Sequence, residues 1–163
     1  MSKPVVEVQV RAVAAASGGV AVFLGNEEKV FVIYVDQSVG VAIAMFMQGT
    51  QRERPLTHDL LANILRALGA KIDRVIVNNL RHGTYFARLV LSAENELNQK
   101  KIIEIDARPS DCIAMAIQQS APIYCGGMAI LLHPGRPRSF AATSEIIAHP
   151  NPPFARLQCN ISM

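Results

Sequence analysis

The sequence predicts an α+β fold with a mixed or antiparallel sheet, about three main helices and two related strand-hairpin-helix halves. Three observations lead to this prediction. Alternating apolar residues mark several strands, three apolar runs have helical spacing, and the order strand, loop, strand, acid, serine, helix occurs twice. The 163 residues, half of them hydrophobic, are enough to bury the core of one domain.

The first half begins with a strand and a hairpin. Residues 6–13 largely alternate between valine and polar side chains. The runs 20–24 and 30–35, rich in strand-forming residues, flank a Gly-Asn-Glu-Glu turn and predict a hairpin. Ser38 then opens a short helix that ends near Gly49 and is apolar nearly all round. We expect such a helix to lie between layers or at a subunit contact.

The second half follows a polar segment and a second helix that stops at Gly69. Runs 72–80 and 84–91 are expected to pair as strands, and 102–106 is expected to form the next strand. A third helix is predicted over 109–120. The later part of the chain turns Pro-rich, so we expect a domain over residues 1–132 and a separate tail over 133–163.

The two halves can be aligned at the starts of their apolar helices. Aligning Ser38 with Ser110 places Val39 opposite Asp111. A strand-hairpin-helix unit cannot bury its apolar face alone, so we expect the two units to share one core.

A second repeated feature is Arg-Pro followed by a hydroxyl residue and an acid. It occurs at 54–59 (Arg-Pro-Leu-Thr-His-Asp) and at 108–111 (Arg-Pro-Ser-Asp), each before an apolar helix-like run. Proline suits a first helical position, Thr57 and Ser110 suit caps, and an acid suits the first turn. A guanidinium beside a helix N-terminus also suits a phosphate, so these motifs can serve folding, function or both.

Charge and cysteine content restrict the class of protein. The net charge is +3, but residues 1–125 carry 13 basic and 12 acidic side chains with no basic block, which leaves nucleic-acid binding undecided. The three cysteines are widely spaced and suit a reducing compartment. The longest apolar run, 39–47, is too short to span a bilayer, so we expect a cytoplasmic protein without a membrane partner.

Three segments together resemble the bifunctional nuclease domain family. They are Arg-Pro-Leu-Thr-His-Asp-Leu-Leu (54–61), His-Gly-Thr-Tyr-Phe-Ala (82–87) and Ile-Asp-Ala-Arg-Pro-Ser-Asp (105–111). The resemblance covers about residues 5–131. It implies an α+β domain that forms homodimers and, from plant members, an activity on DNA and RNA. Members usually carry Glu-Ala where this chain has Val39-Gly40, which puts catalytic activity in question.

The predicted function is a nuclease that hydrolyses phosphodiester bonds of DNA, RNA or both. Such chemistry needs an activated water and charge neutralisation on the phosphoryl oxygens. The catalytic candidates are His58, Asp59, Asp106 and Asp111, and the phosphate-binding candidates are Arg54 and Arg108. The acids could hold Mg²⁺ or Mn²⁺, although no tight metal motif is present. Each candidate also has a structural alternative, as a helix-start acid, a capping histidine or an arginine bracing an acid.

A second function class stays open, a non-catalytic homo-oligomeric module that binds a nucleotide, nucleic acid or protein through the Arg-Pro helix starts. We expect a homodimer or higher oligomer, because the helix over 39–47 has no polar face. We also expect the two Arg-Pro motifs to meet, with Thr57 and Ser110 as caps rather than nucleophiles, because an unpaired buried charge costs several kcal/mol.

Overall fold

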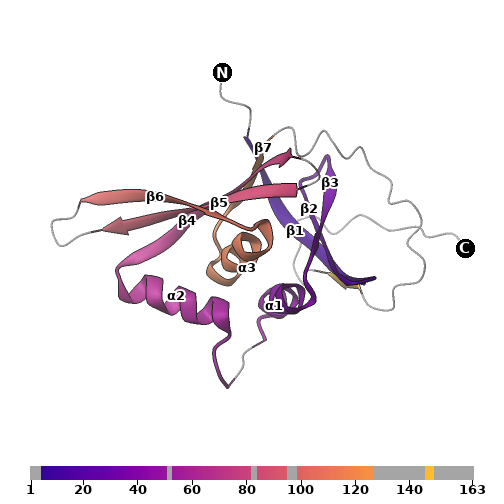
Figure 1. The fold of residues 1–163 in the computed structure, drawn as a ribbon, viewed down its shortest axis with the longest axis horizontal. Helices are drawn as coiled ribbons and strands as arrows, with labels where there is room; N and C mark the ends of the chain where they lie inside the picture. The colour runs from indigo at the N-terminus through magenta and orange to yellow at the C-terminus, as the bar shows by residue number, and fades with distance from the viewer. Residues whose placement is uncertain (1–4, 51–52, 82–83, 95–98, 127–145, 149–163) are drawn as a thin grey trace, which may run out of the picture.

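The computed structural model describes residues 5–50, 53–81, 84–94, 99–126 and 146–148 (Figure 1). These residues form a mixed sheet with three helices packed against it, as predicted. In chain order the elements are β1 (Val5–Ala16), β2 (Gly19–Gly25), β3 (Val30–Val35), α1 (Gln37–Gln48), α2 (Thr57–Ala67), β4 (Ala70–Arg81), β5 (Thr84–Glu94), β6 (Lys100–Ala107), α3 (Pro109–Gln119), β7 (Ile123–Gly126) and β8 (Ile146–Ala148).

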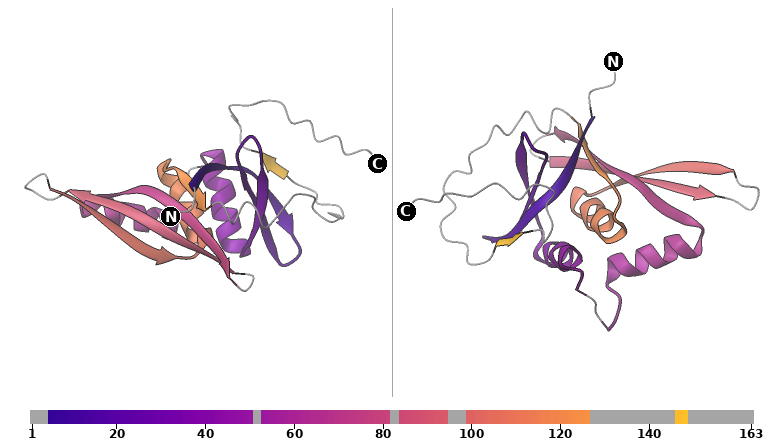
Figure 2. Two further views of the ribbon diagram at one scale, coloured as in Figure 1. Left: turned by 90° about the horizontal axis from the view of Figure 1, so that it is seen from above. Right: turned by 180° about the vertical axis from the view of Figure 1, so that it is seen from behind.

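The sheet consists of two antiparallel meanders joined through β7. The strand order is β3-β2-β1-β7-β4-β5-β6, and β8 pairs with β1 outside this path. β7 is antiparallel to β1 and parallel to β4, which makes the sheet mixed. Each meander leads into a helix, β3 into α1 and β6 into α3, while α2 links the halves. Figure 2 shows the two meanders on either side of α3, in keeping with the two predicted strand-hairpin-helix halves.

The two equivalent helices start in the same register. Asp36 is the N-cap of α1 and Arg108 is the N-cap of α3, so Ser38 and Ser110 both occupy the second helical position. The alignment of Ser38 with Ser110 therefore holds at the level of backbone structure. The N-cap residue is an acid in the first half, Asp36, and a base in the second half, Arg108.

The prediction that Thr57 and Ser110 are N-caps is wrong. Thr57 is the first helical residue of α2, whose N-cap is Leu56, and Ser110 lies inside α3 and is buried. The physical reason is clear in α2: the Asp59 carboxylate accepts the backbone N–H of Leu56 at 2.9 Å. The acid in the first turn thus supplies the capping bond that the hydroxyl residue was expected to make.

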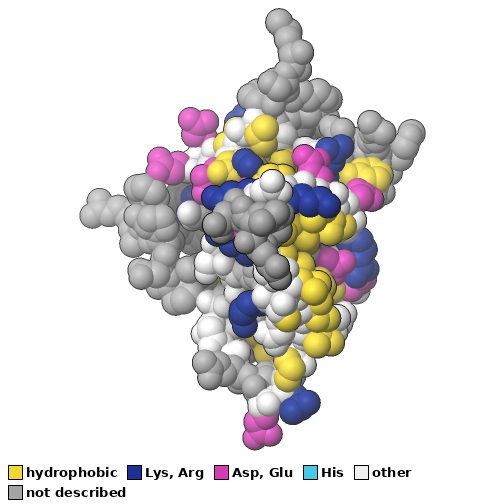
Figure 3. Space-filling model, turned by 90° about the vertical axis from the view of Figure 1, so that its left-hand side faces the viewer, with side chains coloured by type: hydrophobic (Ala, Val, Ile, Leu, Met, Phe, Trp, Pro, Cys, Tyr) yellow, Lys and Arg dark blue, Asp and Glu magenta, His cyan; other side chains and the backbone are white. Residues whose placement is uncertain are grey.

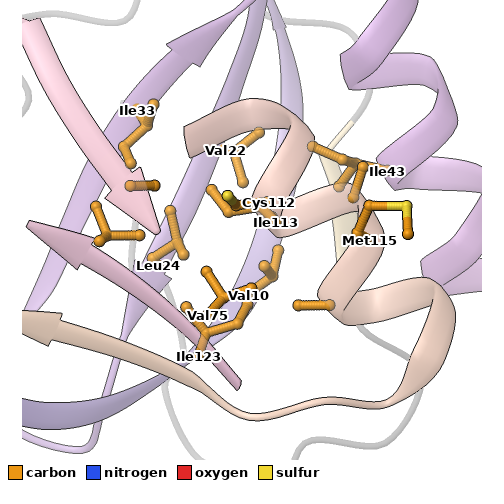
Figure 4. Packing of buried hydrophobic residues seen from close by; sticks show 14 of the residues in the cluster. Val10, Val22, Leu24, Ile33, Ile43, Val75, Cys112, Ile113, Met115 and Ile123 are labelled. Carbon is orange, nitrogen blue, oxygen red and sulfur yellow. The ribbon is translucent and has the colours of Figure 1, made fainter. Parts of the chain in front are cut away.

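α3 lies at the centre of the core. Cys112, Ile113 and Met115 are at most 1% exposed, and Figure 4 shows them among buried residues of both meanders. α1 buries Ile43 and packs on β2 and α3, while its Val41 is 41% exposed, so the expected position between layers holds for only part of this helix. A Cβ added at Gly40 would lie 2.4 Å from Cβ of Val20, so the close approach of α1 to β2 depends on glycine.

Two sequence-based expectations fall largely outside the described residues. Of the tail over 133–163, the structure describes only β8, whose Ala148 pairs with Ala12 of β1. The domain boundary at residue 132 therefore stays a prediction. His82 and Gly83 of the second family segment are also outside the described residues. Within the described part of the chain, no helix is long and apolar enough to cross a membrane.

Candidate functional site

Arg108 joins the first turns of α1 and α3. Its Nε and Nη2 donate to the Asp111 carboxylate at 2.8 and 3.2 Å, and its Nη1 donates to Asp36 Oδ2 at 3.3 Å. The hydrogen bonds to Asp111 raise the pKa of Arg108, with the charges of Asp111 and Asp36 acting in the same direction. The N-caps of the two related helices are thus an ion pair, although the exposed guanidinium limits its contribution to stability.

His58 of α2 approaches the same carboxylate. Its Nε2 lies 3.6 Å from Asp111 Oδ1, longer than a hydrogen bond, and its side chain is only 14% exposed. The Phe46 ring of α1 meets the imidazole edge-on, with ring centroids 6.2 Å apart. His58 and Asp111 belong to different Arg-Pro motifs, so the expectation that the two motifs meet is confirmed at this contact.

A second contact between the motif-bearing helices is made by Asp59. Its Oδ1 accepts from Gln118 Nε2 of α3 at 3.2 Å, while its Oδ2 accepts the backbone N–H of Leu56. Both carboxylate oxygens are therefore engaged in holding α2 in place. The Gln118 Oε1 atom is buried and finds no hydrogen-bond partner among the described residues.

Two clefts flank this group of side chains. The strand cleft, about 1100 Å³, lies between β3 and the β5–β6 pair, and Ser17, Tyr34, Phe86, Asp106, Arg108 and Ser110 are among its lining residues. The helix cleft, about 690 Å³, lies among the three helices and is lined by Phe46, Arg54, Leu56, Asp59, Asn63 and Gln118, among others.

The six predicted site residues therefore divide into three groups. His58, Arg108 and Asp111 are in direct contact and form, with Asp36, what we call the Arg108 cluster. Arg54 and Asp59 line the helix cleft, and Asp106 lines the strand cleft with Arg108. Sequence reasoning did not select Asp36, Phe46 or Gln118 for the site. Asp36 had a usable signal, because it precedes its helix where Arg108 precedes α3.

Metal ligation and thiol chemistry gain little support from the geometry. In the residues that the structure describes, no three His, Cys, Asp or Glu side chains gather so that they could hold a metal ion. The predicted Mg²⁺ or Mn²⁺ therefore has no ready set of ligands in this part of one subunit.

Burial, followed by the charges of Asp111 and Asp106, raises the pKa of Cys112 to about 12. That thiol is neutral near pH 7 and is not an activated nucleophile.

Comparison with known proteins assigns the family. The model of the bifunctional nuclease domain matches residues 22–130, and the chain belongs to this family. An uncharacterized protein of Mycobacterium tuberculosis is 36% identical over 99 residues, covering 61% of this chain and 56% of that protein. Bifunctional nucleases 1 and 2 of Arabidopsis thaliana are 28% and 27% identical over 106 residues, covering 61% of this chain and 32% of each relative. The chain thus spans about half the mycobacterial protein and about a third of the plant proteins.

Proposed function

We propose that this protein is a nuclease that hydrolyses phosphodiester bonds of DNA, RNA or both at the Arg108 cluster. The observation that carries the proposal is the contact of His58 with Asp111, while the same carboxylate holds Arg108. Membership of the bifunctional nuclease domain family and the names of the two Arabidopsis relatives support the reaction class.

Each member of the cluster has a role in the proposed chemistry. His58 takes a proton from the attacking water, and Asp111 orients the imidazole. Arg108, whose side chain is 63% exposed, neutralises charge on the phosphoryl oxygens. Asp59, with both oxygens engaged, acts as a positioning residue for His58. Arg54 at the helix cleft contacts a neighbouring phosphate.

The proposed active form is a homodimer or higher homo-oligomer. α1 packs on β2 and α3. α2 and its C-cap present a larger apolar face whose residues are 41–73% exposed, namely Leu60, Leu61, Ile64 and Leu68. Figure 3 shows hydrophobic side chains gathered on the side of the molecule that faces left in Figure 1, where α2 lies. A second copy of this chain is the proposed occupant of that face. The buried free thiols Cys112 and Cys125 suit the cytoplasm as its location.

A non-catalytic binding module is the second candidate function. It is favoured by the absence of an acid at Val39, the position equivalent to Asp111, and by the capping role of Asp59. In this case the Arg108 cluster would bind nucleic acid, a nucleotide or a protein without turnover.

The decisive experiment is an assay of the purified chain on single- and double-stranded DNA and RNA, each with Mg²⁺, with Mn²⁺ and with EDTA. We expect turnover by the wild type and a loss of about 10²- to 10⁴-fold in Asp111→Asn and His58→Gln. The matched control is Asp73→Asn, which removes a different Arg-paired acid, 2.9 Å from Arg74 on β4, and should keep full activity. Melting temperatures should be nearly the same in all variants.

The outcomes separate the two candidate functions. Binding of nucleic acid without turnover under any condition would support the non-catalytic module. Turnover that survives both cluster substitutions would place the catalytic site elsewhere on the protein.

A further inference from the structure

The strand cleft lies between the two ends of the sheet. β3 and β6 are the terminal strands in the sheet order, yet residues of β3, β5 and β6 line one cleft. The sheet therefore curls so that its two ends approach each other without pairing. The cleft of about 1100 Å³ is slightly larger than the range of about 300–1,000 Å³ that is usual for ligand pockets.

Two exposed aromatic rings, one from each half of the molecule, border this cleft. Tyr34 of β3 is 64% exposed and Phe86 of β5 is 43% exposed, and both belong to the lining. Their strand neighbours Ile33, Val35 and Ala87 point into the core, so alternation turns both rings outward. Tyr85, which precedes Phe86 and also belongs to the lining, has a buried hydroxyl without a hydrogen-bond partner among the described residues.

The charges of the cleft restrict what it can accept. Asp36, Asp106 and Arg108 are the charged side chains of its described lining, which gives a net charge of −1. A phosphate deep in the cleft would meet two carboxylates, whereas a neutral base would meet aromatic faces and acceptors for its amino groups. Arg108 also holds Asp111 of the proposed catalytic cluster, so a phosphate there would lie at the border between cleft and cluster.

We propose that the strand cleft is a base-binding subsite for single-stranded nucleic acid, in which a base stacks on Tyr34 or Phe86 while its phosphate lies at Arg108. This inference rests on the proposed nuclease function and adds the substrate class. Stacking requires an unpaired base, because the faces of bases in a duplex are already covered by their neighbours. The subsite therefore selects single strands over duplexes.

The test is a binding titration of the full chain with labelled phosphorothioate oligonucleotides, which resist hydrolysis. Three probes are compared: a single strand, its duplex, and an abasic single strand with the same number of phosphates. We expect Tyr34→Ala and Phe86→Ala to weaken binding of the base-containing single strand by about 5- to 100-fold, the range that one base–aromatic stack provides. Binding of the abasic strand should not change in either variant.

Two further variants control for side effects. Tyr34→Phe keeps the ring and should keep wild-type affinity, because the stack needs the aromatic face and not the hydroxyl. Ile102→Ala removes a 55% exposed apolar side chain of β6 and should leave binding unchanged. Equal affinity of the wild type for single strand and abasic strand, or no effect of either aromatic truncation, overturns the subsite.

The result is separable from that of the nuclease assay. If the wild type cleaves nucleic acid but the aromatic truncations leave single-strand binding unchanged, the subsite is wrong and the nuclease proposal stands. If base-dependent binding requires Tyr34 but no turnover occurs, the subsite stands and the nuclease proposal fails.

Discussion

Gly40 shows how one residue is determined by its neighbour across the core. Its missing Cβ leaves room for Val20, whose Cβ would otherwise be 2.4 Å away. An alanine at position 40 therefore clashes with valine at position 20 in this backbone. The sequence alone shows a glycine inside this helix but not the reason for it, because the contact between Gly40 and Val20 joins α1 to β2.

We predict that Gly40→Ala lowers the free energy of unfolding by about 1–3 kcal/mol, the usual cost of overpacking a core. In a Val20→Gly background, Gly40→Ala should cost much less, since that background lacks both the clashing Cβ and its methyl groups. Urea unfolding of the wild type, both single variants and the double variant measures the coupling. Strictly additive effects would show that the two residues do not compete for space.

The two buried thiols make the free energy of unfolding depend on pH. Burial raises the pKa of Cys112 and of Cys125 to about 12, well above the ordinary value for a thiol. As pH rises, the thiols of the unfolded chain lose their protons before those of the folded chain. The stability that the neutral buried thiols contribute is therefore complete below about pH 9 and is lost between about pH 9 and 12. Each thiol can lower stability by at most about 1.4 kcal/mol per pH unit in that window.

Urea unfolding at pH 8, 9 and 10 checks this prediction against the double variant Cys112→Ala/Cys125→Ala. The wild type should lose stability with rising pH more steeply than the variant, even though cavity formation makes the variant less stable at pH 8. Parallel pH profiles would show that the thiols do not titrate differently in the folded and unfolded chain.

At the scale of elements, α2 is the helix whose role the sequence predicted least well. Its apolar spacing predicts a helix with one apolar face, but no prediction said what that face contacts. In the structure Ala62 is its buried residue, while Leu60, Leu61, Ile64 and Leu68 stay exposed. Periodicity identifies a helix and its faces, but it does not say what covers each face. By contrast α1, expected between layers or at a subunit contact, packs on α3 and β2 but leaves Val41 exposed.

The exposed face of α2 predicts the oligomeric state. Ile64→Asp should convert the assembly to monomers, because a carboxylate in an apolar contact between copies is costly to desolvate. Light scattering coupled to size exclusion measures the mass of wild type and variant. Val41→Asp, at a 41% exposed position on α1, is the matched control and should leave the assembly intact. A monomeric wild type at micromolar concentration would contradict the proposal.

At the scale of the whole molecule, local patterns predicted the strands, the helices and the internal repeat, because each depends on spacing within one segment. The meeting of His58 with Asp111 was also predictable, since two charged helix starts need partners. The strand cleft was not predictable, because it depends on how far the sheet curls between β3 and β6. Tyr34 consequently carried no signal of function in the sequence, and Phe86 stood out only through its place in the family segment 82–87.

The nearly balanced charge of residues 1–125 leads to the last prediction, on the salt dependence of nucleic-acid binding. If stacking in the strand cleft supplies much of the affinity, few phosphates need to be neutralised. With Arg54 and Arg108 as the two phosphate contacts, log K should fall with log salt concentration with a slope of about −1.4, from about −0.7 per contact on a single strand. Titrations of the single-stranded probe across salt concentrations measure the slope, and Arg54→Gln should make it shallower by about 0.7. A much steeper slope in the wild type would mean that a more basic surface than this site binds the strand, and that phosphate contacts rather than base stacking hold the substrate.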